Sequence, residues 1–397
     1  MNTLPPEVDR RIAVLSDIEM GAGGPTDDFP STVWLAEHLR AFATHRTPTC
    51  AVELVFNGDT FDLLKTSTHA GLYPRHITAS VALEKLERVL MVHAPIIEAL
   101  RDALEAGCGV HFVVGNHDLE LVFPEVQQRL REAIGDSVCF PGFSTSFGDV
   151  YIEHGSQDDP LFRVDPDRLF VDVQGEQVLC QPWGAVALLD VALPLQRALY
   201  HFDRLKPRER VLELLPELRE LLLDAYWSYW TREYVTDWFS GSDPLKTMDW
   251  SVFREIVYRF ATDDADVAIG GDWIRRMHTD KRHRVFLLGH EHRARQESWG
   301  NRKVLRSGAV RQEFMVEDDG VRQIPMPKIW IEVAQVGDRT VHSQLVEHVC
   351  PPVPPGYAPT TIYDTLSDVR QARAQVESQR AAREAHERHI VWPWSRR

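Results

Sequence analysis

Cysteine is scarce in this 397-residue chain, which holds five. Cys50, Cys108, Cys139, Cys180 and Cys350 are odd in number, widely scattered and without a closely spaced pair. Disulfide frameworks and thiolate zinc sites both need regular, close spacings, so neither is indicated. We expect free thiols that are buried.

Long apolar runs and a surplus of positive charge are also lacking. The longest apolar stretch, 185–195, is interrupted by Asp190 and Pro194, whereas a membrane-spanning helix needs roughly 20 residues. Residues 1–11 carry prolines and acidic side chains where a secretory signal has a basic start and an apolar run, so we predict a cytoplasmic protein. The formal charge of -15 opposes broad attraction to nucleic acid or anionic membranes.

What the sequence does contain is an alternation of short β-branched runs with helical stretches, which predicts a layered α/β domain. The region 77–106 has helical periodicity, is broken near Pro95 and ends at Gly107, so it predicts a helical crossover between strands. Each predicted strand in this part of the chain ends in polar or histidine residues. These strands are 12–15, 52–56, 110–114, 149–152 and 285–288.

The later chain predicts further β structure and several additions. We expect strands at 304–305, 330–335 and 341–346, which close a catalytic domain over 11–349. The interval 160–281 is mostly helical in pattern and holds six of the eleven tryptophans, either as the small core of a helical subdomain or as an apolar lid beside an active site. A Pro-rich linker, 350–360, then precedes a polar helical tail, 361–397, which we expect to be solvated or docked.

Seven side chains stand just past predicted strand ends and together suggest a metal site. Their mixture of carboxylate, amide and imidazole suits borderline-hard divalent cations. One such residue would be weak evidence because strand ends often cap helices or form turns, but five strand ends together favour a metal centre. The seven are Asp17, Glu19, Asp59, Asn116, His154, His290 and His292.

The order of these residues resembles the calcineurin-like metallophosphoesterase superfamily over about 11–345. The resemblance implies a four-layer α/β/β/α sandwich, here with a helical insertion and a helical tail, that hydrolyses phosphoesters. The motifs that carry it are Asp17-x-Glu19, Gly58-Asp59-x-x-Asp62, Gly115-Asn116-His117-Asp118, His154-Gly155 and Gly289-His290-x-His292.

The resemblance also implies two divalent metal ions, with Asp59 bridging them. Asp17 and His292 would bind the first ion, and the second ion would be bound by Asn116, His154 and His290. Two ions about 3.5 to 4 Å apart can hold a bridging hydroxide and neutralise a phosphoryl group during in-line attack.

The resemblance gives His117 a role in phosphate binding and leaving-group protonation, with Asp118 orienting its imidazole. Histidine titrates near neutral pH and a carboxylate partner selects its tautomer, so such an acid is physically reasonable. The alternative for His117 and Asp118 is a helix-capping turn.

One position departs from the family pattern, because Glu19 stands where the first motif usually has histidine. A carboxylate ligand there would favour manganese or magnesium over zinc or iron, so we predict Mn²⁺ with the other three as alternatives. Glu19 could instead be a surface residue whose ligand function is lost. We expect Asp62 to cap a helix or support a ligand.

The substrate is less well defined by the sequence. Basic clusters lie at 197–210 and 275–284, and Arg275 and Arg276 in the second are candidate contacts for an anionic substrate, although most charge runs are solvated. The insertion is loosely similar to that of UDP-2,3-diacylglucosamine pyrophosphate hydrolases, which favours a small phosphodiester or pyrophosphate with an apolar or nucleotide portion. The alternatives are a nuclease of the same superfamily and a binding or scaffold protein with weakened catalysis.

Overall fold

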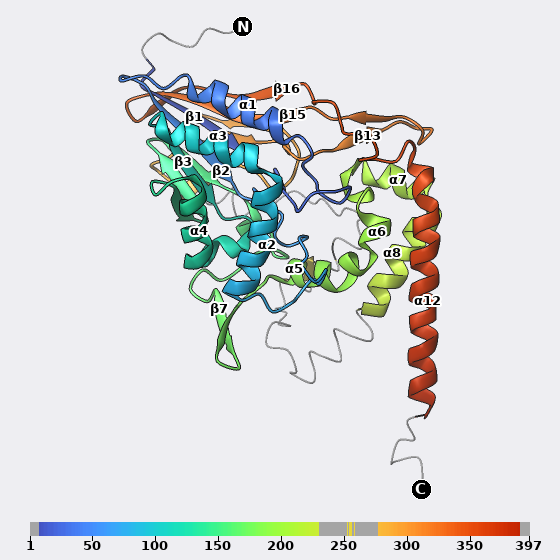
Figure 1. Cartoon of the computed structure of the whole chain (residues 1–397). Coiled ribbons are helices and arrows are strands. Elements are labelled where there is room, and N and C mark those ends of the chain that lie inside the picture. Colours follow the sequence, from blue (N-terminus) through green and yellow to red (C-terminus); the bar gives the residue numbers. More distant parts are fainter. Residues whose placement is uncertain (1–7, 230–251, 253, 256–257, 259–276, 390–397) are drawn as a thin grey trace.

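Two β-sheets with flanking helices form the body of the molecule (Figure 1). The computed structural model describes residues 8–229, 252, 254–255, 258 and 277–389. This architecture confirms the predicted α/β class.

The first sheet has six strands in the order β16-β15-β1-β2-β3-β4. Strands β1 to β4 are parallel to one another, whereas β15 runs antiparallel to both β1 and β16. The predicted strands at 12–15, 52–56, 110–114, 330–335 and 341–346 all fall in this sheet. Its members are β1 (Arg10–Leu15), β2 (Ala51–Asn57), β3 (Gly109–Val113), β4 (Cys139–Gly142), β15 (Lys328–Val336) and β16 (Arg339–His348).

The second sheet has five strands in the order β11-β12-β10-β6-β5. Strand β10 is parallel to both β6 and β12, so the two histidine-bearing strands predicted from the sequence are direct neighbours. The members are β5 (Ser144–Phe147), β6 (Val150–Glu153), β10 (Val285–Leu288), β11 (Arg295–Trp299) and β12 (Arg302–Arg306).

A layer of mostly β-branched side chains joins the two sheets. Ile12 and Val55 of the first sheet belong to the same buried cluster as Ile152 and Leu287 of the second. Side chains alternate between the faces of a strand, so the opposite face of the first sheet is free to pack against helices. The sandwich places the carboxyl ends of β1, β2, β3, β6 and β10 in one region.

Helices cover the outer face of the first sheet and bury its aromatic residues (Figure 1). Phe56 and Phe112, from neighbouring strands, stack with ring centroids 5.0 Å apart beneath them. The predicted crossover helices are confirmed, with Pro95 in the first turn of the second, where proline is tolerated. The covering helices are α1 (Thr32–Ala43), α2 (Ala79–Val92), α3 (Ala94–Glu105) and α4 (Pro124–Ile134).

The described part of the 160–281 interval is helical with added β structure. Its short strand β9 pairs with β13 of a small three-stranded sheet that β14 completes. Trp230, Trp238, Trp250 and Trp273 lie outside the described residues. The elements of the interval include β7 (Phe170–Val173), β8 (Glu176–Leu179), α5 (Trp183–Ala187), α6 (Gln196–Leu199), β9 (Leu205–Lys206), α7 (Arg208–Leu214) and α8 (Pro216–Ser228). Their sheet partners β13 (Phe314–Val316) and β14 (Gln323–Pro325) come later in the chain.

The tail helix α12 (Leu366–His389) docks beside α6 and α8 (Figure 1). Ile362 and Val369 are buried in a cluster that includes Leu218 and Leu221 of α8. The narrow apolar stripe of the tail therefore binds the insertion. No described helix is long and apolar enough to cross a membrane.

The five cysteines are free thiols, as the sequence predicts. Cys50 and Cys108 are buried, Cys180 and Cys350 are partly buried, and Cys139 is exposed. The expectation of burial therefore holds for two of them and is wrong for Cys139.

Candidate metal centre

Backbone hydrogen bonds join the loops that follow the five strands. The Asp17 N–H donates to Gly58 O at 3.2 Å, and the Gly289 N–H donates to His154 O at 2.8 Å. The Val310 N–H donates to Asp17 O at 3.1 Å. These bonds hold the strand ends of both sheets together, and the seven residues predicted to bind metal lie in this region.

The backbone is strained where these side chains emerge. Among the described residues other than glycine, positive φ occurs at five of the predicted site residues and at Gln174. Such conformations cost on the order of 1–3 kcal/mol each and persist only where surrounding contacts impose them, often at functional sites. The five site residues are Asp17, Glu19, Asp59, His290 and His292, with φ between 51° and 71°.

Two positions require glycine because side chains of the site approach the backbone closely there. A Cβ on Gly58 would lie 2.4 Å from Cγ of His154, and a Cβ on Gly115 would lie 2.2 Å from Oδ1 of Asp59. Any larger residue at either position would displace a candidate ligand. The Gly-Asp and Gly-Asn motifs thus have a steric reason beyond turn formation.

Asp59, Asn116, His154 and His290 form what we call the imidazole half of the site. Nδ1–H of His154 donates to Asn57 O at 2.9 Å, which leaves the ring's lone pair on Nε2. That nitrogen lies 3.1 Å from Asp59 Oδ2 and 3.2 Å from Asn116 Oδ1. Three atoms that can each ligate a metal ion, the imidazole in its neutral form, converge in a buried place, and their donor chemistry fits a divalent cation.

His290 adds a second imidazole to this half. One ligand atom each from Asp59, His154 and His290 lie within 4.8 Å of one another. The ring of His290 also lies 3.2 Å, through Nε2, from Oδ2 of buried Asp159, and its backbone N–H donates to Asp17. Sequence reasoning missed Asp159, whose only signal is its place in the polar loop that follows His154.

The electrostatics of the imidazole half favour positive charge. Burial opposes ionisation of Asp59, but His154 and His117 outweigh it and lower the pKa of the carboxyl. Burial likewise opposes protonation of His154, yet Asp59 and Asp17 raise its pKa to about 9. The same negative field that attracts a proton attracts a metal ion.

Asp17 and His292, predicted to bind the first ion, are also brought together. Nε2 of His292 lies 3.3 Å from Asp17 Oδ1, and Nδ1 lies 3.0 Å from Glu313 Oε1. Burial and Arg311 oppose protonation of His292, but Asp17 and Glu313 raise its pKa to about 9. Sequence reasoning missed Glu313, which lies after β12 in the chain and belongs to none of the recognised motifs.

Glu19 is buried, and its carboxylate contacts two protein cations. Nη1 of Arg311 lies 3.1 Å and 2.9 Å from its two oxygens, and Nζ of Lys65 lies 2.7 Å from Oε2. Burial raises the pKa of Glu19, but Arg311 and Lys65 outweigh it and hold the pKa well below its usual range. Glu19 is therefore not the surface residue that the sequence allowed.

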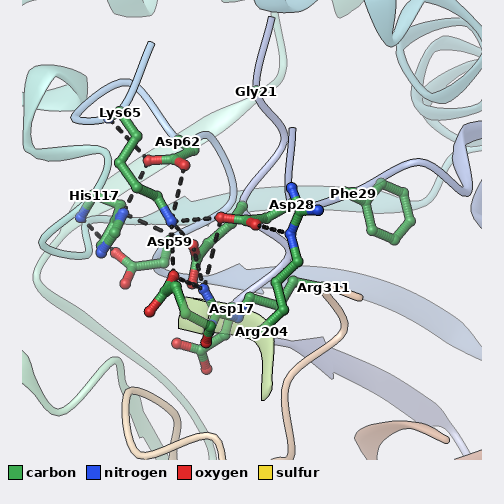
Figure 2. Close-up of polar contacts among 12 residues, drawn as sticks. Asp17, Gly21, Asp28, Phe29, Asp59, Asp62, Lys65, His117, Arg204 and Arg311 are labelled. Carbon is green, nitrogen blue, oxygen red and sulfur yellow. Dashed lines mark hydrogen bonds and ion pairs between the residues drawn. The ribbon is translucent and has the colours of Figure 1, made fainter. Parts of the chain in front are cut away.

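Lys65 and Arg311 connect Glu19 to further carboxylates. Figure 2 shows Lys65 in contact with two of them, Asp28 and Asp62. Lys65 pairs with Asp28, Asp62 and Asp203, and Arg311 pairs with Asp203. Neither cation carried a signal in the sequence, because each stands outside the recognised motifs. We call Glu19, Lys65, Arg311, Asp28, Asp62 and Asp203 the ion-pair half of the site.

His117 lies beside both halves, and its neighbour differs from the one expected. Its Nδ1–H donates to Asp62 Oδ1 at 2.9 Å, whereas Asp118 accepts from the backbone N–H groups of Gly115 and Thr60. Asp62, rather than Asp118, orients the imidazole, and Asp118 supports the loops. Burial opposes protonation of His117, but Glu19, Asp59 and Asp62 raise its pKa to about 10.

Two arginines of the first predicted basic cluster pair with carboxylates of the protein. In the first cluster, Arg204 is buried and donates to Asp28 at 2.6 Å, and Arg208 pairs with Asp203 at 3.0 Å. These two arginines are engaged within the protein. Arg275 and Arg276 lie outside the described residues.

The insertion supplies an aromatic wall beside the imidazole half. The ring of Phe162 packs edge-on against the ring of His290, with centroids 5.4 Å apart. Phe162 also packs with Trp183 and Tyr226 against a small buried cluster. The described insertion therefore contributes both a core of its own and an apolar surface at the site.

No protein-family model matches the chain, and no curated protein matches it by sequence. A structural search finds phosphopantetheinyl hydrolase PptH from Mycobacterium tuberculosis, at 12% identity and TM-score 0.27, covering 76% of this chain and 91% of that one.

It also finds a putative 5'-nucleotidase from Staphylococcus aureus, at 11% identity and TM-score 0.31. A further match is the sulfate thiohydrolase SoxB from Thermus thermophilus, at 11% identity and TM-score 0.30. The nucleotidase match covers 92% of this chain and 58% of the nucleotidase chain, and the SoxB match covers 95% of this chain and 62% of the SoxB chain. Such scores assign no family, so the chemistry rests on the site geometry.

Proposed function

We propose that this protein hydrolyses a phosphoester with the help of a divalent metal ion bound by Asp59, Asn116, His154 and His290. The observation that carries the proposal is the convergence of Asp59 Oδ2, Asn116 Oδ1 and His154 Nε2 at 3.1–3.2 Å in a buried, strained site. Among the described residues, no lysine or arginine pairs with Asp59. The carboxylate thus keeps its charge for an ion.

The hydrogen bonds around these ligands support the proposal. Asn57 O accepts from His154 Nδ1–H, and the His117 N–H donates to Asp59 Oδ1 at 2.7 Å. Such contacts orient ligands and select the metal-binding tautomer. A divalent ion bound here supplies a Lewis acid that polarises a phosphoryl oxygen and lowers the pKa of bound water.

His117 is the proposed proton donor to the leaving group. Glu19, Asp59 and Asp62 raise the pKa of its imidazole in the ion-free protein against the effect of burial, and Asp62 holds the ring by Nδ1. An acid is useful where the departing oxygen would otherwise leave as an unstable alkoxide. His117 follows Asn116 directly, so the donor stands next to the metal ligands.

The aromatic wall favours a substrate with an apolar or nucleotide portion. Phe162 contacts His290, so a group bound against its ring would lie near the reacting phosphate. Phe162→Ala should impair large substrates more than small generic esters. Phe170→Ala is the control, because Phe170 packs on Phe123 and, among the described residues, makes no ring contact with a histidine of the site. Equal losses of activity for large and small substrates would show that the aromatic wall does not select the substrate.

The function is tested by a hydrolysis screen of monoesters, diesters and pyrophosphates together with metal analysis. We expect hydrolysis that is lost on chelation and restored by Mn²⁺, and Asp59→Asn should remain inactive under both conditions. A protein that binds metal and hydrolyses none of the three classes would instead be a binding or scaffold protein. Activity that survives complete metal removal would refute the proposal.

A further inference from the structure

The ion-pair half of the site already contains cations where the resemblance implies the first metal ion. That ion would use Asp17, Asp59 and His292, with Glu19 in place of the usual histidine. The structure instead places the Lys65 ammonium 2.7 Å from Glu19 Oε2 and the Arg311 guanidinium within 3.1 Å of both oxygens. To ligate a metal ion, Glu19 would have to give up one or both partners.

Arg311 is held in place from several sides. It is 2% exposed, its Nη2 donates to Asp203 O at 2.8 Å, and its Nε donates to Glu313 Oε1 at 3.2 Å. Its backbone N–H donates to Asp17 O at 2.9 Å. The guanidinium therefore cannot leave Glu19 without breaking its contacts to buried Glu313 and to Asp203.

Lys65 is held by the same network of acidic groups. Its Nζ lies 3.2 Å from Asp62 and 3.3 Å from Asp203, and it also pairs with Asp28. Its backbone N–H donates to Asp62 Oδ1 at 3.1 Å. Figure 2 shows Lys65, Asp28, Asp62 and Arg311 in one connected set of contacts.

The charges in this half balance without a metal ion. With Glu313 on Arg311 included, five carboxylates face five basic side chains, since Arg204 pairs with Asp28, Arg208 with Asp203 and Lys206 with Glu313 in addition to the two cations on Glu19. A divalent ion added here would meet two fixed positive charges at close range. Donor atoms of Glu19, Asp62 and His117, and of Glu19, Asp28 and Asp203, do lie within 4.8 Å of one another, as in the imidazole half. Here, however, Lys65 and Arg311 already occupy Glu19, whereas no described lysine or arginine pairs with Asp59.

We propose that Lys65 and Arg311 replace the first metal ion, so that the protein binds one divalent ion per chain, in the imidazole half. The inference rests on the proposed function and narrows it to a site with one metal ion and two protein cations. Glu19 is then a carboxylate that positions those cations, and Asp17 and His292 border the bound ion without holding a second one.

The test is the metal content of the full chain after equilibrium dialysis against Mn²⁺, with electron paramagnetic resonance of the bound ion. We expect one ion per chain and the hyperfine pattern of isolated Mn²⁺. Two ions with the spectrum of an exchange-coupled pair would overturn the inference and leave the proposed function standing. No bound ion at all would overturn both.

A matched pair of variants then locates the ion. His154→Ala should lose it, because His154 lies in the imidazole half, whereas His292→Ala should keep one ion per chain. In a two-ion site each variant would lose one ion and keep the other, which would overturn the inference. The stoichiometry of the unsubstituted chain decides the question even where a variant fails to fold.

Discussion

Both halves of the site contain a buried carboxylate, but the groups that face this carboxylate differ between them. In the imidazole half, carboxylate, amide and imidazole atoms converge, and Nε2 of His154 can hold either a proton or a metal ion there. In the ion-pair half, Glu19 is equally buried, yet both of its oxygens contact protein cations. A buried carboxylate needs a positive partner. The comparison shows that the partner can be an ion from solution or a side chain from the same chain.

The largest expected effect comes from the carboxylate at the boundary of the halves. Asp59→Asn removes the charge that faces His154 at 3.1 Å, so hydrolysis should fall below detection and metal content should drop sharply. Activity assays and metal analysis on the same preparation measure both. Full activity with unchanged metal content would show that Asp59 is not a ligand.

The next effect concerns His117, the proposed proton donor, which contacts both halves. His117→Ala should lower turnover by about 10²- to 10⁴-fold, the usual contribution of general acid catalysis, while the bound ion remains. The loss should shrink for a nitrophenyl ester, whose leaving group needs little protonation. If esters with good and poor leaving groups lose activity equally, His117 is not the donor.

A third experiment converts the ion-pair half toward the imidazole half. Lys65→Met removes the ammonium from Glu19, Asp28 and Asp62, so a second Mn²⁺ should bind at millimolar metal. Breaking a buried pair of this kind costs about 3–5 kcal/mol of the free energy of unfolding.

Lys85→Met is the matched control for that experiment, because Lys85 forms a buried pair with Glu120 at 3.3 Å and, among the described residues, no ion pair with a residue of the site. It should lose stability in the same way and keep the metal content of the unsubstituted chain. Identical metal content in both variants would mean that Lys65 does not keep a second ion out.

The smallest expected effect is a pH dependence of metal stabilisation. In the ion-free protein the pKa of His154 is raised from 6.5 to about 9, so its stabilising contribution is full below pH 6.5 and is lost as pH rises through 9. Since one pKa unit corresponds to about 1.36 kcal/mol, this contribution is on the order of 3 kcal/mol.

Metal and proton compete for His154, so added Mn²⁺ should raise Tm more at pH 9 than at pH 6.5. Thermal unfolding at both pH values, with and without chelator, measures the difference. His154→Ala should abolish it. An increase in Tm that is larger at pH 6.5 would contradict the assignment of His154 as a ligand.

Much of the fold and the candidate ligand set could be predicted because their signals are local. Strand β10 reads as an apolar run ending in Gly289-His290, and the helices between β2 and β3 show their periodicity and their break at Pro95. The spacing of Asp17 and Glu19 likewise placed both side chains at one strand end. What local pattern could not supply was the partner of each side chain.

The sequence by itself determined which residues stand at the ends of the strands, because alternation and turn chemistry act over a few positions. Only the tertiary structure decided that Glu19 meets Lys65, 46 positions away, and Arg311, 292 positions away. It likewise paired His117 with Asp62 instead of the adjacent Asp118. Packing the two sheets brings these distant loops together, and burial then forces every charge to find a partner that no local pattern encodes.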